Sequence, residues 1–258
     1  MTAADLDADT VQIVAVLLVV GWLVALLRGI TSRRRALRPG ALIGTGVAAA
    51  LLLTAALASD AVVDAGNGPS TLDLIVTTFV RAHRSTALTV IAGTLDVVAG
   101  TVALGALAVF VAGLLARRGH RFEAGLVLAA SAVSAIAIYG LKLLYARPRP
   151  PAADRLITES GFSMPSGHAL GSTAVLGVLA VIGWSLLRSR SVRITLVAVA
   201  ASGIVVTGCS RVYLGVHWAG DVLDGWLIGG ALVALSAVAL STRRSGLPVA
   251  EPLAVAQT

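Results

Sequence analysis

Hydrophobic residues occur along this chain in long blocks, and short polar clusters separate one block from the next. A helix needs roughly 17–25 mostly apolar residues to cross the hydrocarbon core of a bilayer. Several blocks have about that length and carry few charges, so we predict membrane-spanning helices. The predicted spans are residues 11–27, 41–59, 97–115, 123–141, 168–187, 194–208 and 222–240.

One shorter segment, residues 71–83, has an amphipathic pattern and follows the helix-capping residue Ser70. Its apolar side is formed by Leu72, Ile75, Val76, Phe79 and Val80. Such a helix lies on a membrane surface or packs against the spans, and we predict the surface position. The next apolar block is too long for one upright span. We therefore place residues 87–96 partly at the interface. Two interpretations of Asp96 stay open, a functional residue and an interfacial charge, and its position near a span end favours the second.

The composition indicates a membrane protein with little mass outside the bilayer. Hydrophobic residues make up 57% of the 258 positions and charged residues only 13%, about half the charged fraction of a soluble domain. The net charge of +7 comes from short arginine-rich clusters between apolar blocks. That pattern is typical of juxtamembrane residues and excludes nucleic acid as the expected partner. The single cysteine, Cys209, excludes an internal disulfide and a multi-cysteine metal site.

The distribution of basic residues predicts how the chain crosses the membrane. Of the 20 lysine and arginine residues, 13 lie in residues 28–38, 117–121, 188–193 and 243–244, which the seven predicted spans place on one side. Basic residues are enriched in cytoplasmic loops, so we predict that this side faces the cytoplasm. The expectation is a multi-pass protein of the plasma membrane, with its N-terminus outside and its C-terminus in the cytoplasm.

Three charged or ionisable residues interrupt the last long apolar run. Arg211, His217 and Asp221 lie between two predicted spans, where charge is costly and usually functional. If the segment from His217 onward is helical, His217 and Asp221 lie at i and i+4 and share a face. The carboxylate can then accept the Nδ1 proton of the imidazole and leave Nε2 free to attack. Taken alone, the segment also fits a short polar loop with a snorkelling arginine.

Two earlier segments carry groups that bind an anion. Lys142 and Arg149 supply positive charge, and a guanidinium group can grip two phosphate oxygens at once. The sequence P-S-G-H at 165–168 opens a span, and the unpaired N–H groups of a helix N-terminus attract anions. Ser166 can add a hydroxyl group, and Gly167 allows a close approach of the backbone. Taken alone, this tetrapeptide also fits an ordinary helix start.

In order along the chain, these residues match K-x6-R-P, P-S-G-H and S-R-x5-H-x3-D, with every signature position filled. The chain thus resembles the type 2 phosphatidic acid phosphatase family of integral-membrane lipid phosphate phosphatases. The resemblance implies an all-α, polytopic membrane helix bundle with a six-helix lipid phosphatase core. We expect one extra N-terminal span with a basic cytoplasmic loop at 1–40, the phosphatase domain at 41–242 and a cytoplasmic tail at 243–258.

The resemblance also implies a role for each motif residue. His217 attacks phosphorus and forms a phosphohistidine, Asp221 orients the imidazole, and His168 protonates the leaving oxygen and then activates water. The residues implied in phosphate binding are Lys142, Arg149, Ser166, Gly167 and Arg211. Arg147, which lies between the first-motif positions, is interpreted as a supporting charge.

The predicted activity is hydrolysis of a lipid phosphate or diphosphate on the outer face of the membrane, without a metal ion or cofactor. The motifs supply one carboxylate, Asp221, and several cations, a set that does not suit a divalent metal. Phosphatidic acid, phosphatidylglycerol phosphate, a polyprenyl diphosphate and a prenyl-sugar phosphate all fit a charged pocket at the bilayer surface. Two alternatives stay open: a lipid phosphotransferase on the same fold, and a non-catalytic membrane transporter or scaffold.

Overall fold

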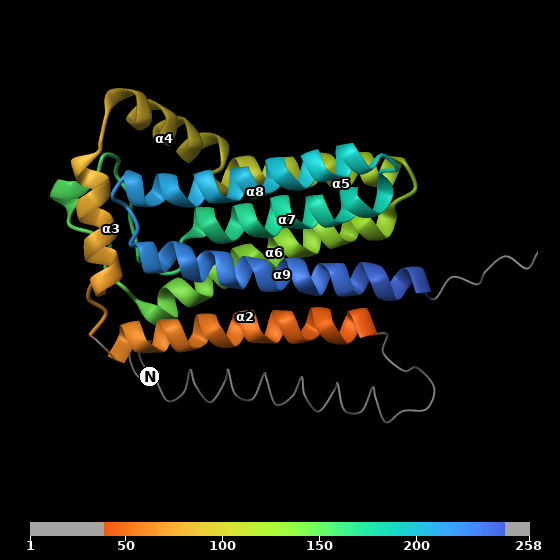
Figure 1. Cartoon of the computed structure of the whole chain (residues 1–258), viewed down its shortest axis with the longest axis horizontal. Coiled ribbons are helices and arrows are strands. Elements are labelled where there is room, and N and C mark those ends of the chain that lie inside the picture. The colour runs from red at the N-terminus through yellow and green to blue at the C-terminus, as the bar shows by residue number, and fades with distance from the viewer. Residues whose placement is uncertain (1–38, 65, 246–258) are drawn as a thin grey trace, which may run out of the picture.

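The computed structural model describes residues 39–64 and 66–245, and every regular element in them is a helix. The six long helices of this described part run alongside one another and form its body (Figure 1). They are α2 (Pro39–Asp64), α5 (Thr101–Arg117), α6 (Arg121–Tyr145), α7 (Gly167–Leu186), α8 (Arg190–Tyr213) and α9 (Ala219–Ser245). The all-α prediction is confirmed, while the predicted span at 11–27 lies outside the described residues.

Two shorter helices lie at one end of this bundle. α3 (Thr71–Ala82) stands across the end, and α4 (Thr86–Val98) runs back from the end of α3 along α8 before the chain enters α5 (Figure 1). A single 3-10 turn, η2 (Ala152–Asp154), lies in the connection between α6 and α7. The long connection from α6 to α7 therefore belongs to the same end of the molecule.

Within residues 39–64 and 66–245, four helices are long and apolar enough to cross a membrane, namely α6, α7, α8 and α9. The bent pair α4 and α5 meets the same criterion when it is taken as one span, with a change of direction of 51°. α2 carries a shorter apolar stretch, Ile43–Ser59. Each predicted span from 41–59 onward therefore corresponds to an observed helix. α8 is longer than predicted, because it continues to Tyr213 and takes Arg211 into its last turn.

Close backbone contact between α7 and α9 determines how the starts of these two helices meet. A Cβ atom at Gly229 of α9 would lie 2.6 Å from the Cβ of Thr173 in α7. A Cβ atom at Gly225 would lie 2.9 Å from the carbonyl oxygen of Ser166. Small residues at helix interfaces let membrane helices approach closely. Larger side chains at these glycines would therefore separate the N-terminal turns that carry motif residues.

α3 is the predicted amphipathic helix, and it begins with a capping box. The Ser70 hydroxyl accepts a hydrogen bond from the Asp73 N–H, and the Asp73 carboxylate accepts one from the Ser70 N–H. Phe79 is 62% exposed, whereas Val76 and Val80 pack against the bundle. The apolar side predicted for this helix is therefore divided between an outward face and a packed face.

The break between α4 and α5 brings Asp96 close to His168 at the start of α7. Gly100 is the N-cap residue of α5. A Cβ atom there would lie 2.9 Å from the carbonyl oxygen of Asp96 and 3.6 Å from Nε2 of His168. The lack of a side chain at Gly100 lets the last turns of α4 approach α7. The predicted division of this region at residue 97 lies close to the observed break.

Candidate active site

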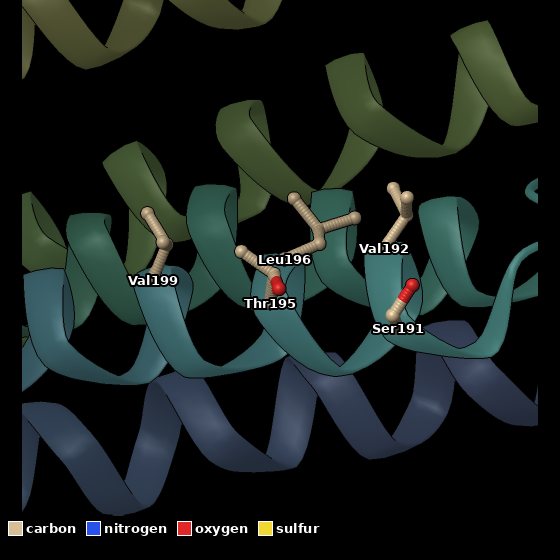
Figure 2. Close-up of a pocket in the computed structure, with 5 residues that line it drawn as sticks. All are labelled: Ser191, Val192, Thr195, Leu196 and Val199. Carbon is tan, nitrogen blue, oxygen red and sulfur yellow. The ribbon is translucent and has the colours of Figure 1, made fainter.

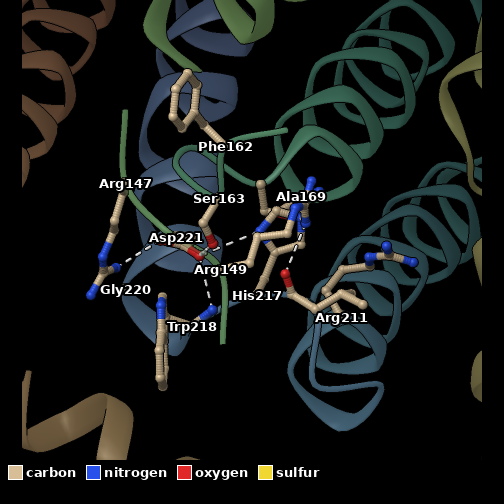
Figure 3. Close-up of polar contacts among 12 residues, drawn as sticks. Arg147, Arg149, Phe162, Ser163, Ala169, Arg211, His217, Trp218, Gly220 and Asp221 are labelled. Carbon is tan, nitrogen blue, oxygen red and sulfur yellow. Dashed lines mark hydrogen bonds and ion pairs between the residues drawn. The ribbon is translucent and has the colours of Figure 1, made fainter. Parts of the chain in front are cut away.

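The three motif segments meet at the end of the bundle that α3 crosses. The last turn of α6 carries Lys142, and the first turn of α7 carries His168. The last turn of α8 carries Arg211, while His217 and Asp221 flank the start of α9. Figure 3 shows residues of α7, α8 and α9, and of the connections that join α6 to α7 and α8 to α9, gathered around Asp221. The fold thus brings together segments that are far apart in the sequence.

His217 is 3% exposed, and both of its ring nitrogens have partners. Nε2 lies 3.1 Å from Nη1 of Arg149, and Nδ1 lies 3.4 Å from Oδ2 of Asp221. A guanidinium group only donates, so Nε2 is the acceptor and the imidazole proton is on Nδ1, facing Asp221. Burial lowers the pKa of His217 to about 3, which keeps the ring neutral near pH 7. This is the tautomer that a nucleophile attacking through Nε2 requires.

Asp221 is fully buried, and its two carboxylate oxygens have different partners (Figure 3). Oδ1 accepts a hydrogen bond from Nη1 of Arg147 over 2.7 Å. Oδ2 faces His217 and also accepts hydrogen bonds from the Ser163 hydroxyl and, over 2.8 Å, from the Trp218 N–H. Arg147, interpreted from the sequence as a supporting charge, therefore holds this carboxylate in place. Ser163 lies outside the motifs, and no local sequence pattern identifies it.

Arg149 reaches the site from the connection after α6 and is held by several carbonyl oxygens. Nη1 donates to the Val216 carbonyl oxygen over 2.8 Å in addition to His217. Nε and Nη2 donate to the carbonyl oxygens of Gly161 and Ser160, each over 3.1 Å. Burial lowers the pKa of Arg149 from its usual value, but a guanidinium group stays charged in a protein. These contacts fix a positive charge beside Nε2 of His217.

Arg211 has a fully buried side chain that binds two carboxylates. Nη2 lies 2.6 Å from Oε1 of Glu159, and Nη1 contacts Oδ1 of Asp96. The other carboxylate oxygen of Glu159 lies 3.5 Å from Nη2 of Arg149. Of the two interpretations of Asp96, the structure favours the functional one, because its carboxylate lies against the motif residue Arg211. The two arginines predicted to bind phosphate are thus already paired with carboxylates of the same chain.

Lys142 is directed at the backbone that leads into α7. Its Nζ contacts the Phe162 carbonyl oxygen and lies 3.3 Å from the Ser163 carbonyl oxygen. The Ser163 N–H in turn donates to the Arg147 carbonyl oxygen over 2.8 Å. Lys142 therefore helps to hold the segment that supplies Ser163 to Asp221. Its implied contact with phosphate stays a prediction.

Ser166 and Gly167 form the start of α7, as the sequence predicts. The Ser166 hydroxyl accepts a hydrogen bond from the Ala169 N–H over 3.5 Å and so caps the helix. The Ser166 N–H donates to the Asp221 carbonyl oxygen over 2.9 Å, which joins the starts of α7 and α9. A Cβ atom at Gly167 would lie 3.3 Å from a methyl group of Ile138. The implied binding of phosphate by these two residues stays a prediction.

His168 lies in the first turn of α7, and its side chain is 14% exposed. Nε2 lies 3.0 Å from the carbonyl oxygen of Asp96 and 3.4 Å from Oδ1 of the same residue. A carbonyl oxygen only accepts, so Nε2 carries a proton in this contact. Asp96 thereby contacts two motif residues, His168 and Arg211, from the end of α4.

Asp96, Glu159 and His168 each offer one ligand atom, and these atoms lie within 4.8 Å of one another. Carboxylate and imidazole groups are residue types that bind divalent cations. The Arg211 guanidinium group, however, contacts both carboxylates, and its charge opposes a cation at this place. The motifs supply one carboxylate, Asp221, but the fold brings two further carboxylates, Asp96 and Glu159, to the motif residue Arg211. The positive charge of Arg211 still opposes the binding of a metal ion here, so a metal-independent site stays our prediction.

A shallow groove on α8 lies apart from the motif residues (Figure 2). It is lined by Ser191, Val192, Thr195, Leu196 and Val199. These residues belong to the first turns of α8, whereas Arg211 lies in its last turn. None of the lining side chains is ionisable, so the groove has no part in the candidate site.

Comparison with known protein families and curated proteins finds relatives of the part of the chain that carries the motif residues. Residues 123–245 match the PAP2 superfamily. Phosphatidylglycerophosphatase B of Bacillus subtilis (strain 168) is 42% identical over 90 residues, which are 34% of this chain and 44% of that protein. Phosphatidylglycerophosphatase B of Escherichia coli (strain K12) is 37% identical over 78 residues, which are 30% of this chain and 29% of that protein. The chain thus spans less than half the length of these curated relatives.

A solved structure is similar over a larger part of the fold. It is the crystal structure of a transmembrane PAP2 type phosphatidylglycerolphosphate phosphatase from Bacillus subtilis, with a TM-score of 0.66 and 27% sequence identity. The similarity covers 76% of this chain and 96% of that chain. The helical architecture of the two proteins is therefore shared well beyond the motif segments.

Proposed function

Because residues 123–245 match the PAP2 superfamily and the fold is similar to that of a transmembrane PAP2 type phosphatase, we propose that this chain is an integral-membrane phosphatase of that superfamily that removes phosphate from a lipid phosphate. The observation that carries the proposal is the state of His217, a buried neutral ring with Nδ1 facing Asp221 and Nε2 beside Arg149. An imidazole paired with a carboxylate is a competent nucleophile, and a fixed guanidinium group stabilises charge on a phosphoryl group. The names of the relatives favour phosphatidylglycerol phosphate as the first substrate to test.

In this proposal, the bound substrate takes over the carboxylate contacts of Arg149 and Arg211. Phosphate oxygens replace Glu159 and Asp96 on Arg211, and they replace Glu159 on Arg149. Nη1 of Arg149 turns from Nε2 of His217 toward the phosphate, which uncovers the lone pair of the nucleophile. Further phosphate contacts are proposed for Lys142, Ser166 and Gly167.

The reaction proceeds in two steps. In the first, Nε2 of His217 attacks phosphorus, the bond from phosphorus to the lipid oxygen breaks, and His168 gives a proton to that oxygen. Asp221 stabilises the positive charge that develops on the imidazole of the phosphohistidine. In the second, a water oxygen attacks phosphorus, the phosphorus–nitrogen bond breaks, and His168 takes the proton of the water. Inorganic phosphate leaves, and both histidines return to their starting protonation states.

We further propose that the site faces outward at the plasma membrane, with the N-terminus outside and the tail in the cytoplasm. One end of the bundle carries the motif residues of four successive helices. They are Lys142 in the last turn of α6, His168 in the first turn of α7, Arg211 in the last turn of α8 and Asp221 in the first turn of α9. The arginine-rich connections at 117–121 and 188–193 join the opposite ends of these helices. Arginine-rich loops are enriched on the cytoplasmic side, which supports an outward-facing site.

Phosphate release from purified protein in mixed lipid–detergent micelles tests the proposed activity. The panel consists of phosphatidic acid, phosphatidylglycerol phosphate, a polyprenyl diphosphate and a prenyl-sugar phosphate, and His217→Ala is the matched control. We expect the wild-type protein to release phosphate from at least one lipid and the variant to release none above background. Transfer of phosphate to an acceptor lipid without free phosphate would favour the phosphotransferase. Failure to turn over any lipid would favour a transporter or scaffold.

A further inference from the structure

Asp73 is a fully buried carboxylate on α3, a helix that contributes no motif residue. Its carboxylate belongs to the capping box of α3, which uses only part of its hydrogen-bonding capacity. The remaining contacts of this carboxylate leave α3 and reach the loop and helix that carry the candidate site.

The first contact runs through Arg147, whose side chain is also fully buried. Nη2 of Arg147 lies 2.7 Å from Oδ2 of Asp73, and Nη1 lies 2.7 Å from Oδ1 of Asp221. Nη2 also donates to the Gly68 carbonyl oxygen over 3.0 Å. One guanidinium group therefore joins two buried carboxylates, one on the surface helix and one behind the proposed nucleophile.

The second contact is made to the backbone next to Asp221. Oδ1 of Asp73 accepts a hydrogen bond from the Gly220 N–H over 2.8 Å, in the first turn of α9. A Cβ atom at Gly220 would lie 3.3 Å from Nη1 of Arg147 and 3.5 Å from Oδ1 of Asp73. Asp73 thus holds both the backbone beside Asp221 and the arginine that binds the Asp221 side chain.

The charges of these three groups decide what Asp73 does for His217. Arg147 carries one positive charge, while Asp73 and Asp221 carry one negative charge each, so the buried group has a net charge of −1. Because Arg147 is shared, the negative charge of Asp221 is not cancelled where it faces Nδ1 of His217. Without Asp73, Arg147 would pair with Asp221 alone and neutralise it in a poorly screened environment.

We propose that Asp73 is a positioning residue for the His217–Asp221 pair and acts through Arg147 and Gly220. It keeps Asp221 in place and preserves the net negative charge that stabilises a positively charged imidazole. This role makes α3 part of the catalytic apparatus, and it rests on the proposed function, in which His217 carries the phosphoryl group.

Asp73→Asn tests the role with little change of size. The asparagine oxygen can still accept from Gly220, but the charge is lost and an N–H donor faces Arg147. We expect kcat to fall by roughly 10- to 100-fold, the loss typical of a residue that orients a catalytic group. The KM should change by less than about threefold, because Asp73 does not touch the substrate. Ser70→Ala is the matched control: it removes the α3 cap and the hydroxyl that donates to Oδ2 of Asp73 over 2.9 Å, but it keeps the negative charge of Asp73 beside Arg147 and Gly220. Its kcat should stay within about threefold of wild type.

A double-mutant cycle with Arg147→Gln separates positioning from a general loss of stability. If Asp73 acts through Arg147, Asp73→Asn should change kcat by less than about threefold in the Arg147→Gln background, because interacting residues are not additive. All kcat values refer to folded protein, measured as the monodisperse fraction in size-exclusion chromatography. If Arg147→Gln does not fold, Asp73→Glu is measured instead. This variant keeps the negative charge, so its kcat should be higher than that of Asp73→Asn.

Several results would overturn the inference. They are a wild-type kcat in Asp73→Asn, a loss that disappears after correction for folded protein, and equal losses in the wild-type and Arg147→Gln backgrounds. A lack of lipid hydrolysis by the wild-type protein would instead contradict the proposed function. Measurements on this one set of proteins therefore distinguish failure of the role proposed for Asp73 from failure of the proposed phosphatase activity.

Discussion

Nη1 of Arg149 donates a hydrogen bond to Nε2 of His217 across 3.1 Å, so a proposed phosphate-binding residue covers the lone pair of the proposed nucleophile. The same guanidinium group contacts Glu159, which also binds Arg211. In this structure Arg149 and Arg211 are therefore paired with carboxylates of the chain, and Arg149 covers the nitrogen of His217 that is proposed to attack phosphorus. In the proposed mechanism, a phosphate group that attracts Arg149 uncovers Nε2 of His217 in the same movement, so substrate binding would activate the nucleophile.

Replacing Glu159 with glutamine should strengthen the binding of an anion. The carboxylate competes with phosphate for Arg149 and Arg211, and glutamine removes that charge while keeping the size of the side chain. Vanadate can adopt the five-coordinate geometry of the transition state and serves as the probe. We expect its inhibition constant to fall by roughly 3- to 30-fold, or about 0.7–2 kcal/mol. Glu123→Gln, at the opposite end of α6, is the control, and an equal constant in both variants would contradict the competition.

The stability of the protein should depend on pH through His217. Its pKa is lowered by burial from 6.5 to about 3 in the fold, so between these values the unfolded chain binds a proton that the folded protein does not. Stability therefore falls as the pH decreases through this window, by up to about 1.4 kcal/mol per pH unit. His217→Gln removes this dependence, so its melting temperature should fall less between pH 7 and pH 4.5 than that of the wild-type protein. His83→Gln, at an exposed position, should follow the wild-type protein, and parallel curves for all three proteins would refute the linkage.

The hydrophobic pattern was sufficient to predict the long helices, because bilayer-spanning segments must satisfy their own backbone hydrogen bonds and remain apolar. It also located the motif residues, which are local in sequence and chemically unusual within apolar runs. The extent of α8 was not predictable in this way. Its last turn contains Ser210 and Arg211, whose polarity resembles that of a loop until their buried partners are known.

The carboxylates around the site illustrate what local patterns do not contain. Asp96 contacts Arg211 across 115 positions of sequence, and Asp73 contacts Arg147 across 74. Glu159 lies in the connection before α7, which has no periodic pattern of its own. Each of these residues resembles an ordinary interfacial or loop charge until the helices bring its partner beside it. Burial and pairing, rather than residue type, distinguish them.

Impermeant thiol labelling on intact cells tests the orientation of the site. In a Cys209→Ala background, Ala153→Cys should react because it lies near the candidate site, in the connection between α6 and α7. Arg118→Cys, in the turn between α5 and α6, should react only after the membrane is permeabilised. The warrant is the concentration of arginine at the Arg118 end of the bundle. Labelling of Arg118→Cys but not Ala153→Cys on intact cells would reverse the topology.

Removal of divalent cations should leave the rate of phosphate release unchanged. Arg211 contacts the carboxylates of both Asp96 and Glu159, and a cation bound to them would face this guanidinium group at short range. Activity assays with and without a chelator measure the effect. Loss of activity in the chelator, followed by recovery with magnesium, would show that the carboxylates serve a metal ion.

Replacement of His168 and replacement of His217 should impair the reaction in different ways. His168→Ala removes the proposed acid, so a lipid alkoxide should leave roughly 10²–10⁴-fold more slowly. An aryl phosphate has a leaving oxygen that needs little protonation, so its phosphoryl group should still be transferred in this variant. His217→Ala removes the proposed nucleophile and should abolish transfer from both substrates. Comparison of the two substrates with the two variants measures this difference, and an equal loss on both substrates in His168→Ala would contradict its role as the acid.

The most direct test of the account is the detection of a covalent phosphoenzyme with a radiolabelled aryl phosphate. In His168→Ala the second step lacks its base, so an acid-labile phosphohistidine should accumulate and remain on the protein after alkaline denaturation. In His217→Ala no label should be retained on the protein. Label retained by His217→Ala and absent from His168→Ala would contradict the central claim and assign the nucleophile to His168.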